Sequence, residues 1–586
     1  MTNITHLTAD EPELLSSPLI IILLALFATS LWFGILGSRV LLNTDEGRYA
    51  EIPREMALSG DFVTPRLNGF KYFEKPPLQY WATAIAFKIW GEGEWTARLW
   101  TALTSFFALL LAAYTGARLW GLQAGIAAST TLASSLFFVL FGELITLDMG
   151  FSVFLFASLC GLILANHQRD TTPKRSDKVW MRFAWAALAL AVLSKGLAAL
   201  VLGGAILLLY SILTRDYEIW RRMEWRWGLA IFILIAAPWF VLVSWRNPEF
   251  AWFFFVHEHF VRFLSTVHRR YQPFYAFVPV FLLCALPWTS LWLHAWAGAW
   301  RREQQRSVND NNSDARNISA FRPLLFLSLW ALLVFVFFSA SSSKLPPYIL
   351  PMAPALALLA GYCYRHFSRR AWCIHYGLTL LALLACLAAT PLIMSGADAE
   401  MPVPMMTEFM HGIQLALLIL SLTAGAALLI AWRGQRLLTS WRGVAWLCMV
   451  SGSMIGLKVG IHAYDNAFSD SRSTKGLVER ARPHMPVGAP MYTLSFYEQT
   501  LPFYLQQLPI LVDIKSEMSF GIEHEPGLQG HRWLADEAAF ASAWAKRKPA
   551  FAFMEIQKFE QLKKVGFPMR ELARNPRYVI VGQLDQ

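Results

Sequence analysis

Charge is scarce in this sequence. Only 16% of its 586 residues are Asp, Glu, Lys or Arg, whereas 56% are hydrophobic and the mean hydropathy is +0.40. This balance excludes an ordinary soluble globular domain. It is typical of a polytopic α-helical membrane protein, whose helices must be apolar where they meet lipid.

Cysteine is also rare, and none occurs in the C-terminal region. The six cysteines, all in or beside apolar stretches, are Cys160, Cys284, Cys363, Cys373, Cys386 and Cys448. We interpret them as small buried residues and predict no disulfide framework.

Nucleotide-binding signatures are missing as well, since no Gly-rich phosphate loop of Walker or Rossmann spacing occurs. The net charge of +11 is spread over short loops and is not gathered in one basic domain. Nucleic acid is therefore not an expected partner. Contact with anionic membrane lipids explains the charge better.

Apolar stretches long enough to cross the hydrocarbon core recur along the chain, and we expect about thirteen transmembrane helices. The first should be a retained anchor, because the residues before it are acidic and no small-residue cleavage site precedes the next polar loop. The predicted spans are residues 18–37, 96–117, 121–142, 149–166, 183–194, 197–213, 228–245, 275–298, 324–339, 349–364, 373–394, 410–431 and 443–462.

Lysine and arginine in short loops predict the orientation, because positive loops stay in the cytoplasm. With thirteen spans, all the loops rich in these residues fall on the same side as the N-terminus. They are residues 167–182, 214–226, 300–322, 365–370 and 433–442.

The other loops then lie outside the cytoplasm, and they carry the candidate residues for chemistry. These are Asp45, Arg48, Tyr72, Glu74, Lys75, Asp148, Lys195, His259, His268, Lys344 and Tyr348. Ionisable residues at a membrane face are costly, so their gathering from separate loops predicts one site. The alternative for any one of them is an ordinary solvated loop charge. For Tyr348 and Tyr72 it is an interfacial aromatic anchor.

The loop at 39–95 is too long for a simple connector. Its segment 78–90 is amphipathic and too short and polar to cross, so we predict a helix lying in the membrane interface. Residues 1–462 form the predicted transmembrane catalytic domain. Residues 463–586 contain no span, and their alternating strand-like and helix-like runs predict a separate small α/β domain outside the cytoplasm.

Several motifs resemble those of the bacterial lipid A 4-amino-4-deoxy-L-arabinose transferases. These enzymes belong to the GT-C glycosyltransferases, which also include the protein O-mannosyltransferases. The motifs are DEGRY at 45–49, YFEKPP at 72–77, ELITLD ending at Asp148, SKG at 194–196, the EHF and PF elements within 258–274, and SKLPPYILP at 343–351. The resemblance covers nearly the whole membrane domain.

The resemblance implies a GT-C fold and transfer of aminoarabinose from undecaprenyl phosphate to a phosphate of lipid A. The transfer would occur at the periplasmic face of the bacterial inner membrane, by a monomer and with inversion at the anomeric carbon, and would confer resistance to polymyxin. Donor and acceptor are both lipid-anchored, so a polar site that opens sideways to the bilayer fits the reaction.

Roles for individual residues follow from that reaction. The departing lipid phosphate needs cations, for which we assign Lys75 and Arg48, with Lys344 and Lys195 in support. Asp45 corresponds to the family's candidate catalytic carboxylate, which positions the acceptor or acts as a base. Asp148 is expected to hold the sugar's amino group or to pair with a lysine.

The sequence offers one candidate metal site, made of His257, His259 and His268 with Glu258, which Glu74 could join from another loop; these ligand types suit a divalent ion such as zinc. A structural or phosphate-contacting role for the histidines is the alternative. Two other functions also stay open. One is a GT-C enzyme that uses a protein or another glycolipid as acceptor. The other is a lipid transporter or flippase, which would place its charges near mid-membrane.

Overall fold

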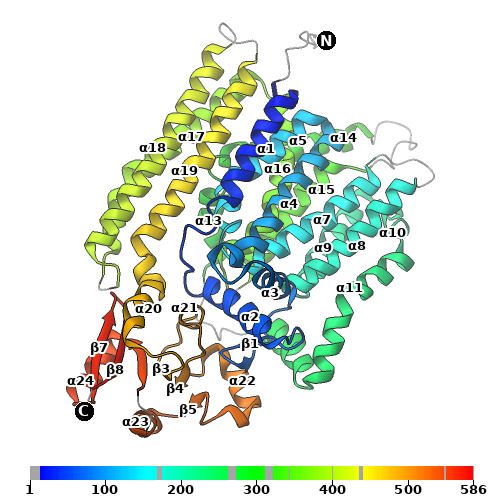
Figure 1. Ribbon diagram of the computed structural model, residues 1–586. Helices are drawn as coiled ribbons and strands as arrows, with labels where there is room; N and C mark the ends of the chain where they lie inside the picture. Colours follow the sequence, from blue (N-terminus) through cyan, green and yellow to red (C-terminus); the bar gives the residue numbers. More distant parts are fainter. Residues whose placement is uncertain are drawn as a thin grey trace.

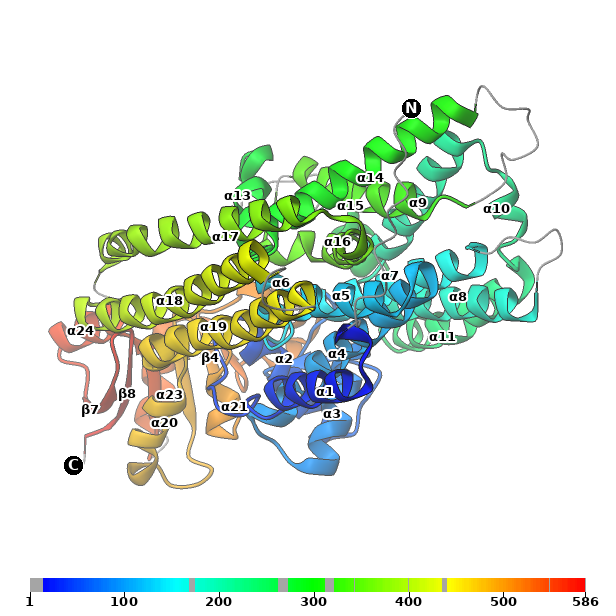
Figure 2. The same ribbon diagram turned by 90° about the horizontal axis from the view of Figure 1, so that it is seen from above.

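The computed structural model describes residues 14–167, 174–261, 272–310, 321–341, 343–398, 400–434, 440–546 and 549–584. The long helices form one bundle, and a sheet-containing domain lies at one end of it (Figure 1). In the view from above, α17, α18 and α19 lie on one side of the bundle and α8 and α11 on the opposite side (Figure 2). The bundle helices are α1 (Pro18–Phe33), α4 (Glu94–Trp120), α5 (Leu122–Ala133), α6 (Leu136–Phe141), α7 (Leu147–Asn166), α8 (Arg175–Lys195), α9 (Ala198–Thr214), α11 (Trp225–Arg246), α13 (Phe277–Cys284), α14 (Thr289–Asp310), α15 (Pro323–Ala340), α16 (Ala353–His366), α17 (Arg369–Ala389), α18 (Val403–Arg433) and α19 (Trp441–Arg472).

Eight helical segments within the described residues are long and apolar enough to cross a membrane, and one bent helix pair could add a ninth. The chain is therefore a multi-pass membrane protein. Each of the thirteen predicted spans falls on a helix or a helix pair, but not all pass this test. Helices α1 and α9 are too short for it, with 16 and 17 residues, and α8 begins in a charged segment.

Two predicted spans are interrupted. The span at 121–142 breaks between α5 and α6, where the hydroxyl of Ser135 accepts a hydrogen bond from the backbone N–H of Phe138 and starts a new helix. The span at 275–298 bends by 114° between α13 and α14. Pro287 lies in that break, and it has no N–H with which to continue a helix. An unbroken apolar run in the sequence does not reveal either break.

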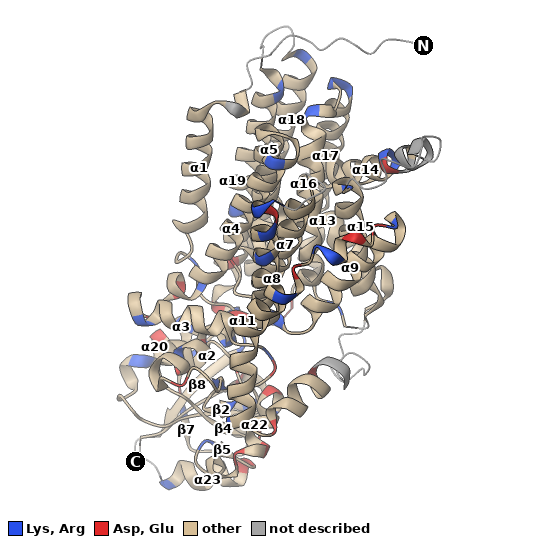
Figure 3. Cartoon of the chain, turned by 90° about the vertical axis from the view of Figure 1, so that its right-hand side faces the viewer, with Lys and Arg blue, Asp and Glu red and all other residues tan. Residues whose placement is uncertain are grey.

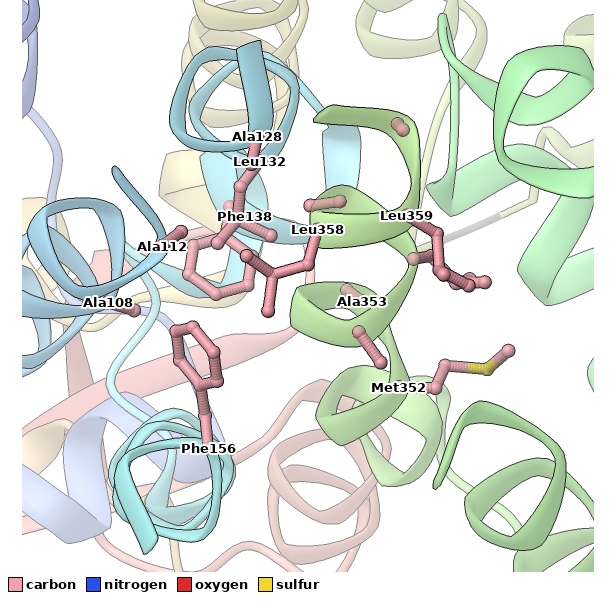
Figure 4. Close-up of a cluster of buried hydrophobic side chains, with 14 of the residues drawn as sticks. Ala108, Ala112, Ala128, Leu132, Phe138, Phe156, Met352, Ala353, Leu358 and Leu359 are labelled. Carbon is pink, nitrogen blue, oxygen red and sulfur yellow. The ribbon is translucent and has the colours of Figure 1, made fainter. Parts of the chain in front are cut away.

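The centre of the bundle is built from small residues and interleaved aromatic rings. Phe138 of α6, Phe156 of α7 and Leu358 of α16 converge between helices that present alanines to one another (Figure 4). A Cβ atom placed on Gly361 would lie 2.3 Å from the carbonyl oxygen of Ala124, so α16 and α5 are in backbone contact there. Small residues allow such close approach where lipid gives helices no hydrophobic reason to associate.

The loop at 39–95 folds into α2 (Asp45–Ser59), the short strands β1 (Arg66–Leu67) and β2 (Phe70–Lys71), and α3 (Leu78–Trp90). Helix α3 has the bounds predicted for the interfacial helix. The interfacial helix predicts that Trp81 and Trp90 both lie at headgroup level. Trp90 is exposed accordingly, whereas Trp81 packs inward and donates a hydrogen bond to the carbonyl of Phe62 at 2.7 Å.

Helix α19 extends to Arg472, past the boundary placed after His462, because the polar residues that end the apolar run remain helical. The domain that follows contains one six-stranded sheet of order β5-β4-β3-β6-β8-β7, parallel from β5 to β6 and antiparallel beyond. Its strands are β3 (Met491–Leu494), β4 (Ile510–Val512), β5 (Trp533–Leu534), β6 (Phe551–Glu555), β7 (Met569–Arg574) and β8 (Tyr578–Gln583). Its helices are α20 (Lys475–Ala481), α21 (Leu501–Leu505), α22 (Ser519–His524), α23 (Glu537–Lys546) and α24 (Ile556–Lys564).

The predicted α/β character of this domain is confirmed. The strand-like runs of the sequence at 490–496, 509–512, 550–555 and 578–583 coincide with β3, β4, β6 and β8. Strands β5 and β7 were not predicted, because β5 has only two residues and β7, with the sequence MRELAR, lacks the apolar alternation of a strand.

The C-terminal domain docks onto the loop at 39–95, where α21 contacts α2 and α22 contacts β2. Helix α2 lies between this domain and the bundle (Figure 1). Gly47 in α2 is a point of close approach. A Cβ atom there would lie 2.5 Å from the carbonyl carbon of Gln499 and 2.6 Å from the backbone nitrogen of Thr500. The ion pair between Arg66 and Glu525, at 2.8 Å, also joins the loop at 39–95 to the C-terminal domain.

We expect Gly47→Ala to lower stability by about 1–3 kcal/mol, because the added methyl group meets backbone atoms that must shift. The thermal unfolding of the solubilised protein should move to lower temperature, and proteolysis of the C-terminal domain should become faster. Gly204→Ala is the matched control, since a Cβ atom at Gly204 in α9 meets nothing within 4 Å. Equal melting temperatures for the two variants would contradict the tight contact at Gly47.

Candidate active site

A cavity of about 2100 Å³ lies between the bundle and the C-terminal domain. It brings together most of the residues that the sequence singled out, from six separate segments of the chain. Those lining it are Asp45, Arg48, Glu74, Lys75, Asp148, Lys195, His257 and Tyr348. Most of the length of the bundle helices carries no Lys, Arg, Asp or Glu (Figure 3), so this concentration of charge stands out.

Helix ends position three of these side chains. Asp45 lies in the first turn of α2 and Asp148 in the first turn of α7, where the positive end of the helix dipole favours a carboxylate. Lys195 is the last residue of α8, where the negative end favours a cation. The starts of α2 and α7 therefore present carboxylates to the cavity, and the end of α8 presents a cation to it.

A buried ion pair fixes the segment that carries Asp45. Arg98 of α4 donates to both carboxylate oxygens of Glu46 at 2.8 Å, and both side chains are almost fully excluded from solvent. Arg98 also donates to three backbone carbonyls of the preceding loop, those of Leu36, Arg39 and Val40. Burial disfavours the carboxylate of Glu46, but the attraction of Arg98 outweighs it and holds the pKa of Glu46 below its ordinary value.

Arg48 lies one turn along α2 and joins two carboxylates. Its guanidinium is 3.3 Å from Asp45 and 2.6 Å from Glu517 of the C-terminal domain. The Asp45 side chain is 49% exposed, whereas those of Arg48 and Glu517 are 13% and 11% exposed. Asp45 is thus the member of this group most accessible from the cavity.

Lys75 and Glu258 form a second charged group on the cavity wall. The Lys75 Nζ atom is 3.5 Å from Glu258 and donates to the carbonyl of Glu74 at 3.0 Å. Glu258 lies in η2 (Trp252–Val261), a π-helical segment, and is 3.6 Å from Nδ1 of His257. The His257 ring stacks on Phe253 with a centroid distance of 5.1 Å.

Asp148 and Lys195 form a direct ion pair, which is one of the two roles predicted for Asp148. The Lys195 ammonium also lies over the ring of Tyr348, 4.4 Å from its centroid. Tyr348 belongs to η5 (Pro346–Met352), so α7, α8 and this proline-rich segment meet at one cation.

Two predicted substrate ligands do not line the cavity. Tyr72 is buried in a hydrophobic cluster with Tyr49 and Tyr80, and burial together with the negative charge of Glu74 raises the pKa of its hydroxyl well above the ordinary value. Lys344 is buried too, and its ammonium donates to the backbone carbonyls of Ser341 and Gln272. Lys344 therefore fixes the loop whose neighbours Ser343 and Leu345 face the cavity.

The predicted metal ligands are only partly described. The side chain of His259 and the whole of His268 lie outside the described residues. Among the described residues, no group of three His, Cys, Asp or Glu side chains is arranged to hold a metal ion. Glu258 is already near Lys75, so the described part of this site fits an ion pair better than a metal.

Beyond its charged end the cavity continues between apolar helices. Side chains of α6, α13, α17, α18 and α19 line this part, including Leu140, Leu283, Leu383, Leu417 and Leu457. One space therefore combines a charged wall with an apolar arm, which is the arrangement that an amphiphilic lipid needs.

From the sequence, the C-terminal domain could be expected to cover the active site or bind the acceptor, but none of its residues was singled out. Phe496, Gln499, Ser516, Glu517, Ser519 and Phe520 all line the cavity. They come from loops, from the 3-10 helix Ser516–Met518 and from the start of α22, and no motif distinguishes them in the sequence. Glu46, by contrast, was visible beside Asp45, but nothing local shows that it pairs with Arg98.

Comparison with known proteins gives consistent matches. Residues 477–583 match the family model of the aminoarabinose transferase C-terminal domain, and residues 19–254 match that of dolichyl-phosphate-mannose-protein mannosyltransferase. A relative from Pseudomonas aeruginosa, named undecaprenyl phosphate-alpha-4-amino-4-deoxy-L-arabinose arabinosyl transferase, is 31% identical over 377 residues. That alignment covers 62% of this chain and 64% of the relative, slightly less than two thirds of its length.

Solved structures extend the match to nearly the whole chain. The crystal structure of ArnT from Cupriavidus metallidurans bound to undecaprenyl phosphate superposes with a TM-score of 0.87 at 30% identity, covering 97% of this chain and 98% of that one. Its apo state gives a TM-score of 0.85.

Fold and site together define a GT-C glycosyltransferase embedded in the membrane. The chain belongs to the aminoarabinose transferase family of these enzymes.

Removal of Arg98 tests the anchoring of the Asp45 segment. We expect Arg98→Met to reduce stability by about 3–5 kcal/mol, because it leaves the buried Glu46 carboxylate without its partner. The solubilised variant should melt at a lower temperature and lose ligand binding. Arg221→Met is the control, because the pair between Arg221 and Glu218 is solvent-exposed and its loss should have no measurable effect. Similar melting curves for the two variants would contradict the anchoring role.

Proposed function

We propose that this protein transfers 4-amino-4-deoxy-L-arabinose from undecaprenyl phosphate to a phosphate of lipid A. The observation that carries the proposal is the single cavity that joins Asp45, Arg48 and Lys75 to an apolar arm. The relatives' names and the lipid bound to the Cupriavidus protein support the same donor.

The charged wall suits a departing lipid phosphate. As the anomeric bond breaks, negative charge grows on the phosphate and the sugar becomes oxocarbenium-like. Arg48 and Lys75 are held in place before the reaction by Glu517 and Glu258, so they can stabilise that charge without reorganising. The guanidinium can form two parallel hydrogen bonds with phosphate, whereas the lysine acts as a point charge.

Asp45 is the proposed catalytic carboxylate. Its exposure to the cavity and its place at the start of α2 let it face the cationic sugar or orient the acceptor. A lipid A phosphate is already an anion near neutral pH, so positioning matters more than proton removal. We assign Asp148 to the sugar's amino group, and its ion pair with Lys195 would fix its position.

The apolar arm would hold the polyprenyl chain or the acyl chains of the acceptor, both of which stay anchored in the bilayer. We place the site and the C-terminal domain on the periplasmic side of the inner membrane, and we propose that the enzyme acts as a monomer with inversion at the anomeric carbon. Resistance to polymyxin would follow from the modified lipid A.

A divalent cation such as zinc at Glu74, His257, His259 and His268 stays a prediction, and no step above depends on it. Transfer activity measured after chelation and after addition of zinc tests it. Loss and recovery of activity would support a bound metal, and unchanged activity would favour phosphate or structural roles for the histidines.

The proposed function makes a prediction about the reaction itself. In a strain that lacks its own transferase but makes the donor, this protein should add one aminopentose to lipid A, and Asp45→Asn should abolish the addition. Mass spectrometry of lipid A measures it. If neither protein changes the spectrum although both are expressed and donor is present, a protein or another glycolipid becomes the favoured acceptor.

Another prediction concerns the stabilisation of the departing lipid phosphate. We expect Lys75→Ala to reduce transfer by about 100- to 1000-fold, as removal of a preorganised electrostatic partner does in other enzymes. Membrane insertion and melting temperature should change little. Lys88→Ala is the control, since Lys88 is exposed on α3 and does not line the cavity. Normal activity in Lys75→Ala would refute the assignment.

A further inference from the structure

The wall that the C-terminal domain contributes to the cavity contains one acidic side chain, Glu517. It lies between β4 and α22, far in sequence from the motifs of the membrane domain. Its carboxylate is 2.6 Å from Arg48, which is the shorter of the two ion pairs that Arg48 makes. The C-terminal domain has no recognisable catalytic motif, yet through Glu517 it contacts Arg48, the residue proposed to bind the donor phosphate.

Glu517 is itself held in place. The side-chain amide of Gln499 donates to its Oε1 atom at 2.9 Å, and Gln499 is buried. Gln499 also forms the backbone contact against Gly47, one residue before Arg48 in α2. The docking of the domain and the position of the Arg48 guanidinium are thus determined by the same few atoms.

Arg48 needs this second carboxylate for a physical reason. With Asp45 as its main partner, the guanidinium would pair fully with that carboxylate, because opposite charges three residues apart on a helix are neighbours. Such a pair would turn Arg48 away from the phosphate and occupy Asp45. Glu517 instead pairs with Nη2 of the guanidinium, whereas Asp45 pairs with Nη1, and little water screens the pair with Glu517 because both side chains are nearly buried.

We propose that Glu517 is a positioning residue of the active site, which holds Arg48 for the donor phosphate and leaves Asp45 available to the sugar or acceptor. Glu517 touches neither substrate and acts through Arg48. The C-terminal domain is then a part of the active site and not only a cover over it. This inference rests on the proposed function, because it assumes that Arg48 binds a lipid phosphate.

The test uses the full-length protein in lipid nanodiscs with undecaprenyl phosphate as the probe. We expect Glu517→Ala to weaken binding of this lipid by about tenfold or more, the value of one charge-assisted hydrogen bond. Glu517→Gln keeps the size of the side chain and serves as the test if the alanine variant fails to fold. It should also weaken binding of the lipid. Glu517→Asp, which keeps the charge, should restore part of the affinity.

A double-mutant cycle separates positioning from a purely structural role. If Glu517 acts through Arg48, the combination of Arg48→Ala with Glu517→Ala should bind no more weakly than Arg48→Ala alone. Glu525→Ala is the matched control, because it also removes an ion pair between the C-terminal domain and the loop at 39–95, but Glu525 does not line the cavity. It should leave binding and turnover unchanged.

Wild-type affinity in Glu517→Gln, or losses that multiply in the double variant, would overturn the inference and leave the proposed function intact. A wild-type protein that neither binds undecaprenyl phosphate nor transfers sugar would overturn the proposed function, and the inference with it. Weakened binding in Glu525→Ala equal to that in Glu517→Ala would reduce Glu517 to a docking contact.

Discussion

The buried pair of Glu46 and Arg98 is the interaction on which the site depends. Arg98 lies in a bundle helix, and its guanidinium holds the Glu46 carboxylate together with three carbonyls of the loop that leads into α2. A charge buried in this way must keep its partners, because no water can replace them. The first turn of α2, with Asp45 and Arg48, is therefore fixed relative to the bundle.

The C-terminal domain extends that constraint to the other side of the cavity. Gly47 allows backbone contact with Gln499, and Arg48 pairs with Glu517, so α2 is held from the bundle by one ion pair and from the domain by another. Lys75 and Lys195 are paired with acidic residues in the same way. The cations of the site are thus preorganised, which is what stabilisation of a departing phosphate requires.

Much of the fold could be predicted from local pattern. The apolar runs marked all eight segments of the described residues that are long and apolar enough to cross a membrane, and amphipathicity gave α3 its correct bounds, because both depend on short stretches of sequence. The breaks before α6 and between α13 and α14 were not predicted, since hydropathy alone does not report backbone direction. Tyr72 and Lys344 were placed in the right segments, but only packing shows that one is buried and the other binds carbonyls.

The sequence by itself determined that this is a polytopic membrane protein, that its C-terminal region is an α/β domain, and that Asp45, Arg48, Lys75, Asp148 and Lys195 were the residues to consider. These conclusions follow from hydropathy, charge and motif, which are local properties. The tertiary structure alone decided which charges pair, because ion pairs such as Arg98 with Glu46 and Arg48 with Glu517 join segments distant in the chain. No local pattern encodes such a contact, and here those contacts determine what each charge in the site can do.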